Sequence, residues 1–214
     1  MQTATNPRDR GKTEQKLIEA LGRVLARDGF ERCGVNAVSR EAKVDKVLIY
    51  RYFGGMPGLL QAYGESSQFW PPVAEILGED RAVLRLPTEE RLPTILLAIY
   101  EALRQRPQTL TIMAWELVQR NPLTDALAQV RETWSQALIQ AALHSAEQGN
   151  IPPAEAVTLA NLVVAGMQYL LLRGRSVEQY GGLALQDDAG RQQIVSAIHL
   201  LGRSLARALP PGTP

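Results

Sequence analysis

The sequence predicts an all-α protein, and three observations support this. Ala, Leu, Glu, Gln and Arg, which favour helices, dominate the chain, and apolar residues recur at helical spacing. Pro and Gly lie mainly between these periodic segments. The alternation of apolar and polar residues that half-buried strands require is scarce. The 214 residues are 45% hydrophobic and 21% charged, which is ordinary for a globular protein with one large core or two modest ones.

About nine helices are expected in order along the chain. Met1–Arg10 is expected to be a polar arm, and Leu17, Leu21 and Leu25 give the first helix, from about residue 11 or 13 to 28, its inward stripe. Gly29 is suited to end that helix in a left-handed conformation. The other helices are expected near residues 35–42, 46–53, 57–69, 89–105, 108–120, 123–148, 154–173 and 188–209, with a loop around 78–87.

Residues 35–53 are the most informative segment, because they read as two short helices around a tight turn. Asp45 is placed to cap the second helix, and Ile49 and Phe53, four residues apart, give it an inward stripe. A helix of this size fits the DNA major groove, where base edges and thymine methyl groups are accessible. The other side of this helix carries Lys46, Val47, Leu48, Tyr50 and Tyr52.

Charge is distributed unevenly along the chain. Residues 1–64 hold 11 Lys and Arg against 7 Asp and Glu, for a net charge of +4, whereas the remainder has a net charge of −3. A basic amino-terminal part is a coarse indication of nucleic-acid contact. The single cysteine, Cys33, excludes an intrachain disulfide and is expected to be a small buried side chain in a reducing, cytoplasmic compartment.

The segment around residues 35–53 resembles the helix-turn-helix domain of the TetR family of transcriptional regulators. The resemblance covers roughly residues 13–64 and implies a DNA-binding domain at 11–56 and an effector-binding and dimerisation domain at 57–209. The rest of the chain is similar to the family only in length and helix pattern. The resemblance rests on Gly29-Phe30, Gly34-Val35, Ala42-Lys43-Val44-Asp45, Ile49-Tyr50-Arg51-Tyr52-Phe53 and the following Leu59-Leu60.

Three residues depart from the family pattern. Lys43 replaces the usual glycine of the turn, which carries a modest backbone cost if that position is left-handed. Gly34 stands where a hydroxyl residue often contacts phosphate, so that contact would fall to its backbone N–H or be lost. Tyr52 replaces a common histidine, and its hydroxyl group can still donate to a phosphate.

The resemblance implies specific roles in DNA binding. Lys46 is expected to reach a guanine edge or a phosphate, and Val47 and Leu48 to contact thymine methyl groups. Tyr50 and Tyr52 are suited to phosphate contacts, and Asn36 to an adenine edge or a phosphate. The alternative is that Val47 and Leu48 simply pack in the core of this segment, whereas a partly buried Tyr50 ring with an exposed hydroxyl satisfies both interpretations. Gly34 completes the set of candidate DNA-binding residues.

The carboxy-terminal part is expected to bind a small-molecule effector and to form a homodimer. Its candidate effector-binding residues are Tyr100, Met113, Trp115, Glu116, Trp134, Leu138, Met167 and Tyr169, although the same list describes an ordinary helical core. The helix near 154–173 is apolar nearly all round, so two helices from each protomer are expected to pair about a two-fold axis. The candidate interface residues are Leu162, Leu170, Ile194, Ile198, Leu201 and Leu205.

The sequence gives little support to an enzyme. His144 and His199 lie on expected helices without a metal ligand at suitable spacing, and no phosphate loop or dinucleotide fingerprint is present. Residues 156–172 are short for a membrane span and contain polar residues. No metal, cofactor or membrane partner is therefore expected.

The expected function is a homodimeric repressor that an effector releases from palindromic double-stranded DNA, with the fourth helix transmitting the change. The alternatives are an all-helical small-molecule-binding protein or enzyme with a purely structural amino-terminal segment, a helical adaptor, or an activator of the same fold.

Overall fold

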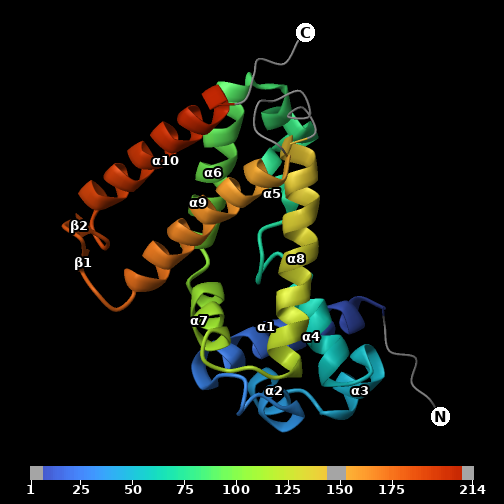
Figure 1. Cartoon of the computed structure of the whole chain (residues 1–214). Helices are drawn as coiled ribbons and strands as arrows, with labels where there is room; N and C mark the ends of the chain where they lie inside the picture. The colour runs from blue at the N-terminus through green and yellow to red at the C-terminus, as the bar shows by residue number, and fades with distance from the viewer. Residues whose placement is uncertain (1–6, 144–152, 209–214) are drawn as a thin grey trace. The chain divides into compact units, whose positions relative to one another are not determined.

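The computed structural model describes residues 7–143 and 153–208 of the chain. These residues form ten α-helices, one 3-10 helix and a two-stranded hairpin (Figure 1), so the prediction of an all-α fold is confirmed. Their packing divides the chain into two compact units. The first unit contains the described residues up to Trp70 together with Arg106–Thr133, and the second contains Pro71–Gln105 together with the described residues from Trp134 onward. The predicted boundary between residues 56 and 57 was placed between the expected DNA-binding and effector-binding domains, and it does not coincide with this division.

The first unit is built around α1 (Pro7–Asp28). The apolar stripe Leu17, Leu21, Val24 and Leu25 on this helix is completely buried. Helix α1 packs against α2, α4 and α7, and α3 packs against α4. The other helices of this unit are α2 (Val35–Ala42), α3 (Val47–Phe53), α4 (Met56–Gly64), α7 (Pro107–Glu116) and the first half of α8 (Pro122–Leu143).

Helix α7 is fixed to the rest of the first unit by hydrogen bonds between residues far apart in the chain. The indole N–H of Trp115 donates to the carbonyl oxygen of Ala26 over 3.4 Å. The hydroxyl group of the buried Thr109 donates to the carbonyl oxygen of Phe69. Residues from 107 onward therefore help to hold the amino-terminal helices in place.

The second unit is built around α6 (Thr88–Arg104), which packs against α5, the 3-10 helix η1, α9 and α10. A Cβ atom added at Gly202 of α10 would lie 2.7 Å from Cα of Pro93 in α6, so only glycine permits this close approach of the two helices. Glu101 of α6 also forms an ion pair with Arg191 of α10 over 2.9 Å. The other elements are α5 (Val73–Leu77), η1 (Glu79–Arg85), the second half of α8, α9 (Pro153–Arg173), β1 (Gln179–Tyr180), β2 (Leu183–Ala184) and α10 (Asp188–Ala208).

The hairpin β1–β2 joins α9 to α10 and was not predicted. Gly181 and Gly182 form its turn with φ of +58° and +84°, and Tyr180 pairs with Leu183. Two consecutive residues with positive φ are what a tight antiparallel turn requires, and glycine adopts that conformation without steric cost. This Gly-Gly pair was therefore an overlooked hairpin signal.

Several predicted boundaries were wrong. Helix α1 begins at Pro7, so the expected polar arm is helical in its last residues, and its first six residues lie outside the described part. Helix α4 ends at Gly64 instead of 69, because the chain turns there. The turn brings the centroid of the buried Phe69 ring to 5.3 Å from that of the Tyr63 ring. Helix α7 ends at Glu116, α5 was not expected, and the expected loop 78–87 contains η1. The expected end of α8 at 148 lies outside the described residues.

Candidate nucleic-acid interface

The orientation of α3 follows from its cap and its single fully buried residue. The carboxylate of Asp45 accepts a hydrogen bond of 2.9 Å from the backbone N–H of Val47, which confirms its predicted capping role. Ile49 has no exposed surface, whereas Phe53 is half-buried. With Ile49 packed into the core, the opposite side of this short helix faces solvent.

The turn between α2 and α3 holds α3 in a defined direction. Lys43 lies in the left-handed region, with φ of +54°, as expected if it occupies the usual glycine position. The backbone N–H of Val44 donates to the carbonyl oxygen of Ser39 over 3.1 Å, and the Ser39 hydroxyl donates back to the carbonyl oxygen of Val44. Two reciprocal hydrogen bonds therefore close the turn despite the strained lysine.

The solvent side of α3 presents basic, aromatic and apolar groups together. Lys46 and Arg51 are exposed, and Val47 and Tyr50 are 61% and 57% exposed. Tyr50 is therefore more open to solvent than the partly buried ring that the sequence suggested. Leu48 is half-buried, which leaves its side chain shared between the core and the surface.

Tyr52 is also half-buried, and its ring has a neighbour from the first helix. The guanidinium carbon of Arg10 lies 5.1 Å from the ring centroid, which is within cation–π distance. Helix α1 thus places a basic group beside α3. The polar arm predicted for residue 10 would not have suggested this contact.

The amino-terminal end of α2 supplies the remaining candidates. Gly34 is extended, with φ of −150°, and offers no side-chain cap, so the first N–H groups of α2 have no partner from a capping side chain. Asn36 is exposed beside them. Open N–H groups at the start of a helix favour an anion such as a phosphate.

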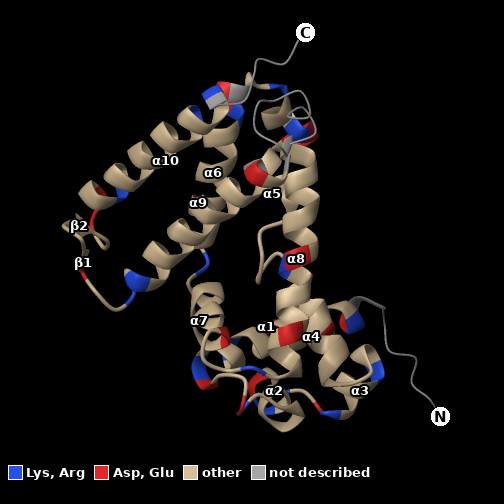
Figure 2. Ribbon diagram, in the orientation of Figure 1, with Lys and Arg blue, Asp and Glu red and all other residues tan. Residues whose placement is uncertain are grey.

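Basic residues of the first unit fall into a paired and an unpaired group. Arg23 and Arg27 each contact the Glu41 carboxylate over 2.8 Å, and these hydrogen bonds, that from Arg27 foremost, lower the pKa of Glu41. Among the described residues, no carboxylate lies within ion-pair distance of Lys43, Lys46 or Arg51. Figure 2 shows basic residues on α3 and on the segment leading into it. Positive charge that no described carboxylate pairs with therefore lies at the turn and on α3, although not only there.

The candidate effector residues do not form one group. Trp115 packs on Gly29 and bonds to Ala26, and Glu116 forms an ion pair of 2.6 Å with Arg131, so packing within the first unit explains both. In the second unit, Tyr169 is exposed, and Trp134 is half-buried. The buried members of the set are Tyr100, Met113, Leu138 and Met167.

A cavity of about 670 Å³ in the second unit is lined by none of these eight residues. Its walls come from α5, η1, α6 and the second half of α8. Sequence reasoning missed it, because three of its seven residues lie in segments that were read as a loop or an interruption. The lining residues are Val73, Arg81, Leu84, Arg91, Ala137, Gln140 and Ala141.

Five of the six candidate dimer residues, all except Leu205, line an apolar groove of about 690 Å³ between α9 and α10. Ile194 and Ile198 are buried within the chain itself, and Leu170 and Leu205 are half-buried. The exposed apolar residues along this groove and on the adjoining face of α10 include Leu200 and Tyr180, which sequence reasoning did not select. They are Leu162, Tyr169, Tyr180, Leu200 and Leu201.

The described residues also bear on metal sites, reactive cysteines and membrane spans. Within residues 7–143 and 153–208, no group of three or more His, Cys, Asp or Glu side chains is arranged to hold a metal ion. Cys33 is a free, buried thiol, as predicted, and burial raises its pKa to about 12. The helices in the described part lack the combination of length and apolarity needed to cross a bilayer.

Comparisons with solved structures show that the fold is shared by several bacterial regulators. NalD, the secondary repressor of the MexAB-OprM multidrug efflux pump in Pseudomonas aeruginosa, matches with a TM-score of 0.67 at 13% identity over 94% of this chain and 98% of that one. The fatty acid degradation regulator FadR from Bacillus halodurans matches with a TM-score of 0.64 at 16% identity, over 88% and 97%. A TetR family transcription regulator from Marinobacter aquaeolei matches with a TM-score of 0.60 at 17% identity, over 95% and 99%.

A search among curated proteins found no significant match. The sequence comparison that does succeed covers the segment with the exposed α3 surface. Residues 17–63 match the sequence profile of bacterial regulatory proteins of the tetR family. The match covers α2, α3 and most of α1 and α4, and so includes every candidate DNA-binding residue.

Proposed function

We propose that this protein is a homodimeric transcriptional repressor that binds a palindromic operator through α3 and leaves it when a small molecule binds the second unit. The observation that carries the proposal is the solvent side of α3, where Lys46, Val47 and Tyr50 are exposed while Ile49 anchors the helix in the core. Such a surface combines groups that read base edges with groups that hold phosphates.

The roles within this surface follow from side-chain chemistry. Lys46 reaches a guanine edge or a phosphate, and Val47 contacts a thymine methyl group, which explains an apolar side chain that is 61% exposed. Tyr50 and the Tyr52 hydroxyl bind phosphates, and Gly34 and Asn36 contact the DNA backbone from the start of α2. Lys43 adds an unpaired charge that the sequence-based list did not include.

DNA binding is tested by selecting bound sequences from random duplex DNA and measuring affinity on the selected duplex by fluorescence anisotropy. Lys46→Ala and Tyr50→Ala are each expected to weaken binding on the order of tenfold, because they remove direct contacts. Lys16→Ala is the matched control, since it removes an exposed charge from α1 and should leave affinity nearly unchanged. Affinity should fall steeply with salt concentration. Failure to select any sequence, or equal losses in all three variants, would contradict the proposal.

Dimerisation is proposed through the groove between α9 and α10. Leu162, Leu200 and Leu201 are 65%, 68% and 47% exposed, and apolar area of this kind is more often covered by a second subunit than left in water. The expected four-helix arrangement would bring these residues of two copies together.

Sedimentation velocity tests this interface directly. Leu201→Glu places a charge in the proposed interface and should shift the protein to monomers at concentrations where the unchanged protein is dimeric. Leu117→Glu is the control, because Leu117 is 78% exposed but lies in the first unit. A Leu201→Glu variant that remains dimeric would exclude this interface.

Repression, rather than activation, is favoured because NalD, which shares the fold, is described as a repressor. Release by an effector requires that the ligand bind the DNA-free conformation better than the DNA-bound one. A reporter gene placed behind the selected operator should be silenced by the protein and derepressed by Lys46→Ala. Higher expression with the intact protein would instead indicate activation.

A further inference from the structure

The cavity in the second unit combines basic and apolar walls. Its volume of about 670 Å³ lies in the range typical of small-molecule sites. Val73 of α5, Leu84 of η1 and Ala141 of α8 are half-buried apolar walls. Two arginines, Arg81 and Arg91, line the same space, and no acidic residue of the described segments does.

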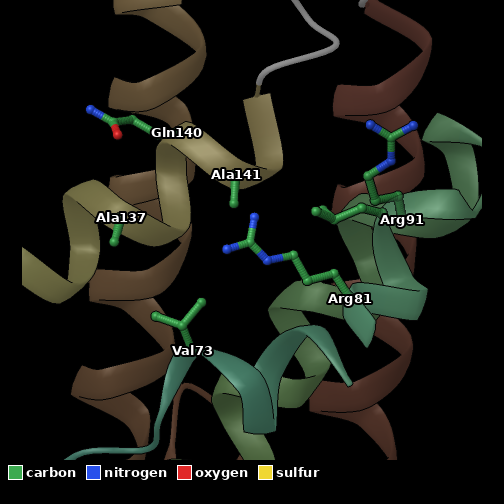
Figure 3. A pocket seen from close by; sticks show the side chains of 7 residues that line it. Val73, Arg81, Arg91, Ala137, Gln140 and Ala141 are labelled. Carbon is green, nitrogen blue, oxygen red and sulfur yellow. The ribbon is translucent and has the colours of Figure 1, made fainter. Parts of the chain in front are cut away.

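Arg81 is the basic group that remains available to a ligand. Figure 3 shows its side chain extended between Val73 and Ala141, whereas the Gln140 amide points away. Its guanidinium group makes no hydrogen bond and no ion pair with any residue of the described segments. Arg81 is exposed, so the charge lies where the cavity opens to solvent.

The backbone holds Arg81 in this position at an energetic cost. Asp80 and Arg81 both lie in the left-handed region, with φ of +51° and +54°, which non-glycine residues rarely adopt. The guanidinium group of Arg85 donates to the carbonyl oxygen of Asp80 over 3.0 Å and so stabilises the kink. The kink directs the Arg81 side chain along the cavity instead of continuing a helix.

Arg91 contributes charge but is already anchored. Its Nε and one terminal nitrogen donate to the carbonyl oxygen of Leu86 over 3.3 and 3.1 Å. Arg91 therefore fixes the end of η1 and keeps the local potential positive. A ligand that meets this cavity finds one available guanidinium group and a positive field from a second.

We propose that this cavity binds an amphipathic carboxylate, whose anionic head pairs with Arg81 at the opening and whose apolar body lies against Val73, Leu84, Ala137 and Ala141. A planar guanidinium group presents two parallel N–H donors that match the two oxygens of a carboxylate. Burial of the apolar body supplies the rest of the affinity. A cation is disfavoured by both arginines, and a neutral analogue leaves Arg81 without a partner.

That this carboxylate is the effector rests on the proposed function, whereas its binding to the cavity does not. Binding is therefore measured first, without DNA. The probes are sodium benzoate, octanoate and cholate, each titrated into the full-length protein by isothermal calorimetry. Octanol and octylamine serve as the neutral and cationic controls for octanoate. At least one carboxylate should bind once per chain, and at least tenfold more tightly than the matched uncharged or cationic compound.

Two variants test the residues that carry the inference. Arg81→Gln should weaken binding of the carboxylate about tenfold or more, because it removes the charge-assisted pair. Arg207→Gln removes the same charge from α10 of the same unit, outside the cavity lining, and should bind within about twofold of the unchanged protein. Ala141→Trp, which fills the cavity but keeps both arginines, should abolish binding, with its fold checked by circular dichroism.

The outcomes separate this inference from the proposed function. No binding of any of the three carboxylates, or equal losses in Arg81→Gln and Arg207→Gln, overturns the inference, whatever happens with DNA. Binding that depends on Arg81 supports it even in a protein that binds no operator, in which case only the proposed function fails. When both hold, the bound carboxylate should release the selected duplex from the unchanged protein, and the same concentration should fail to release it from Arg81→Gln.

Discussion

At Gly22, helix α1 lies very close to its neighbours. Replacing this glycine by alanine therefore tests the packing of the first unit. A Cβ atom at this position would lie 2.6 and 2.9 Å from Cε2 and Cζ of Tyr63, and 2.5 Å from Nε2 of Gln108. The Gln108 amide is the end of a flexible side chain and can move. The Tyr63 ring is 1% exposed and is enclosed by its neighbours, so it cannot.

The expected magnitude is the balance of two opposing effects. Alanine favours an α-helix over glycine by about 1 kcal/mol, which stabilises the folded state. Forcing an extra carbon into a well-packed core costs about 1–3 kcal/mol. The overlap with the ring is large, since ordinary contacts begin at 3.4 Å, so the upper part of this range applies. We therefore expect Gly22→Ala to lower the free energy of unfolding by about 1–2 kcal/mol, or the melting temperature by about 2–8 °C.

Urea unfolding followed by circular dichroism measures this difference, and the same helix offers a matched control. A Cβ atom at Gly11 of α1 would have no atom within 4 Å, so Gly11→Ala should be neutral or stabilising by up to about 1 kcal/mol. The clash involves ring atoms that phenylalanine keeps, so Tyr63→Phe should not rescue Gly22→Ala, whereas Tyr63→Leu should reduce its cost. A Gly22→Ala protein as stable as Gly11→Ala would refute the tight packing of α1 on α4.

Four further outcomes follow from the first unit. Gly34→Thr meets no atom within 4 Å of its Cβ and supplies a hydroxyl group at the start of α2, so affinity for the selected duplex should rise about two- to tenfold by anisotropy; weaker binding would place the phosphates elsewhere. The buried Tyr63 hydroxyl has no hydrogen-bond partner among the described residues, so Tyr63→Phe should leave the unfolding free energy unchanged or raise it by about 1 kcal/mol; a clear loss would indicate an unseen partner. Cys33, whose pKa is raised from 9.0 to about 12, should react with iodoacetamide at pH 8 about a thousandfold more slowly in the native than in the urea-unfolded protein, and comparable rates would contradict its burial. Because the unfolded thiol ionises first, Cys33 should also make stability fall as pH rises above about 9.

The elements that sequence reasoning placed correctly are those whose signals are local. Helix α3 was predicted because Asp45 supplies a cap to Val47 two residues away and Ile49 lies at helical spacing within the same seven residues. The element η1 was missed for the opposite reason. It depends on left-handed conformations at both Asp80 and Arg81, and although aspartate adopts this region more readily than most residues, arginine does not. The hairpin was missed although its Gly-Gly turn was visible, because strands of two residues leave no alternating pattern to detect.

The candidate site shows the same division between local and distant information. The exposed side of α3 follows from helical periodicity once Ile49 is assigned inward, so Lys46, Val47 and Tyr50 could be selected from the sequence. Whether an aromatic residue lines a cavity or a core depends on partners that periodicity cannot supply. Trp115 was selected as an effector residue, yet its indole N–H donates to Ala26, 89 residues earlier in the chain.

Helix α8 has residues in both units. In its first half, Leu127 and Val130 pack against Gly64 of α4, where a Cβ atom would lie 3.2 and 3.0 Å from their side chains. In its second half, Ala137 and Ala141 line the cavity of the second unit. One unbroken helix from Pro122 to Leu143 therefore carries both contacts.

A ligand in the cavity would contact the alanine side of the same helix whose first half packs on α4. Helix α4 in turn packs against α1 and α3. The sequence-based hypothesis assigned the transmission of the effector signal to the fourth helix alone. That assignment stays a prediction, and the contacts of Gly64 add α8 to the elements whose states an effector would have to distinguish.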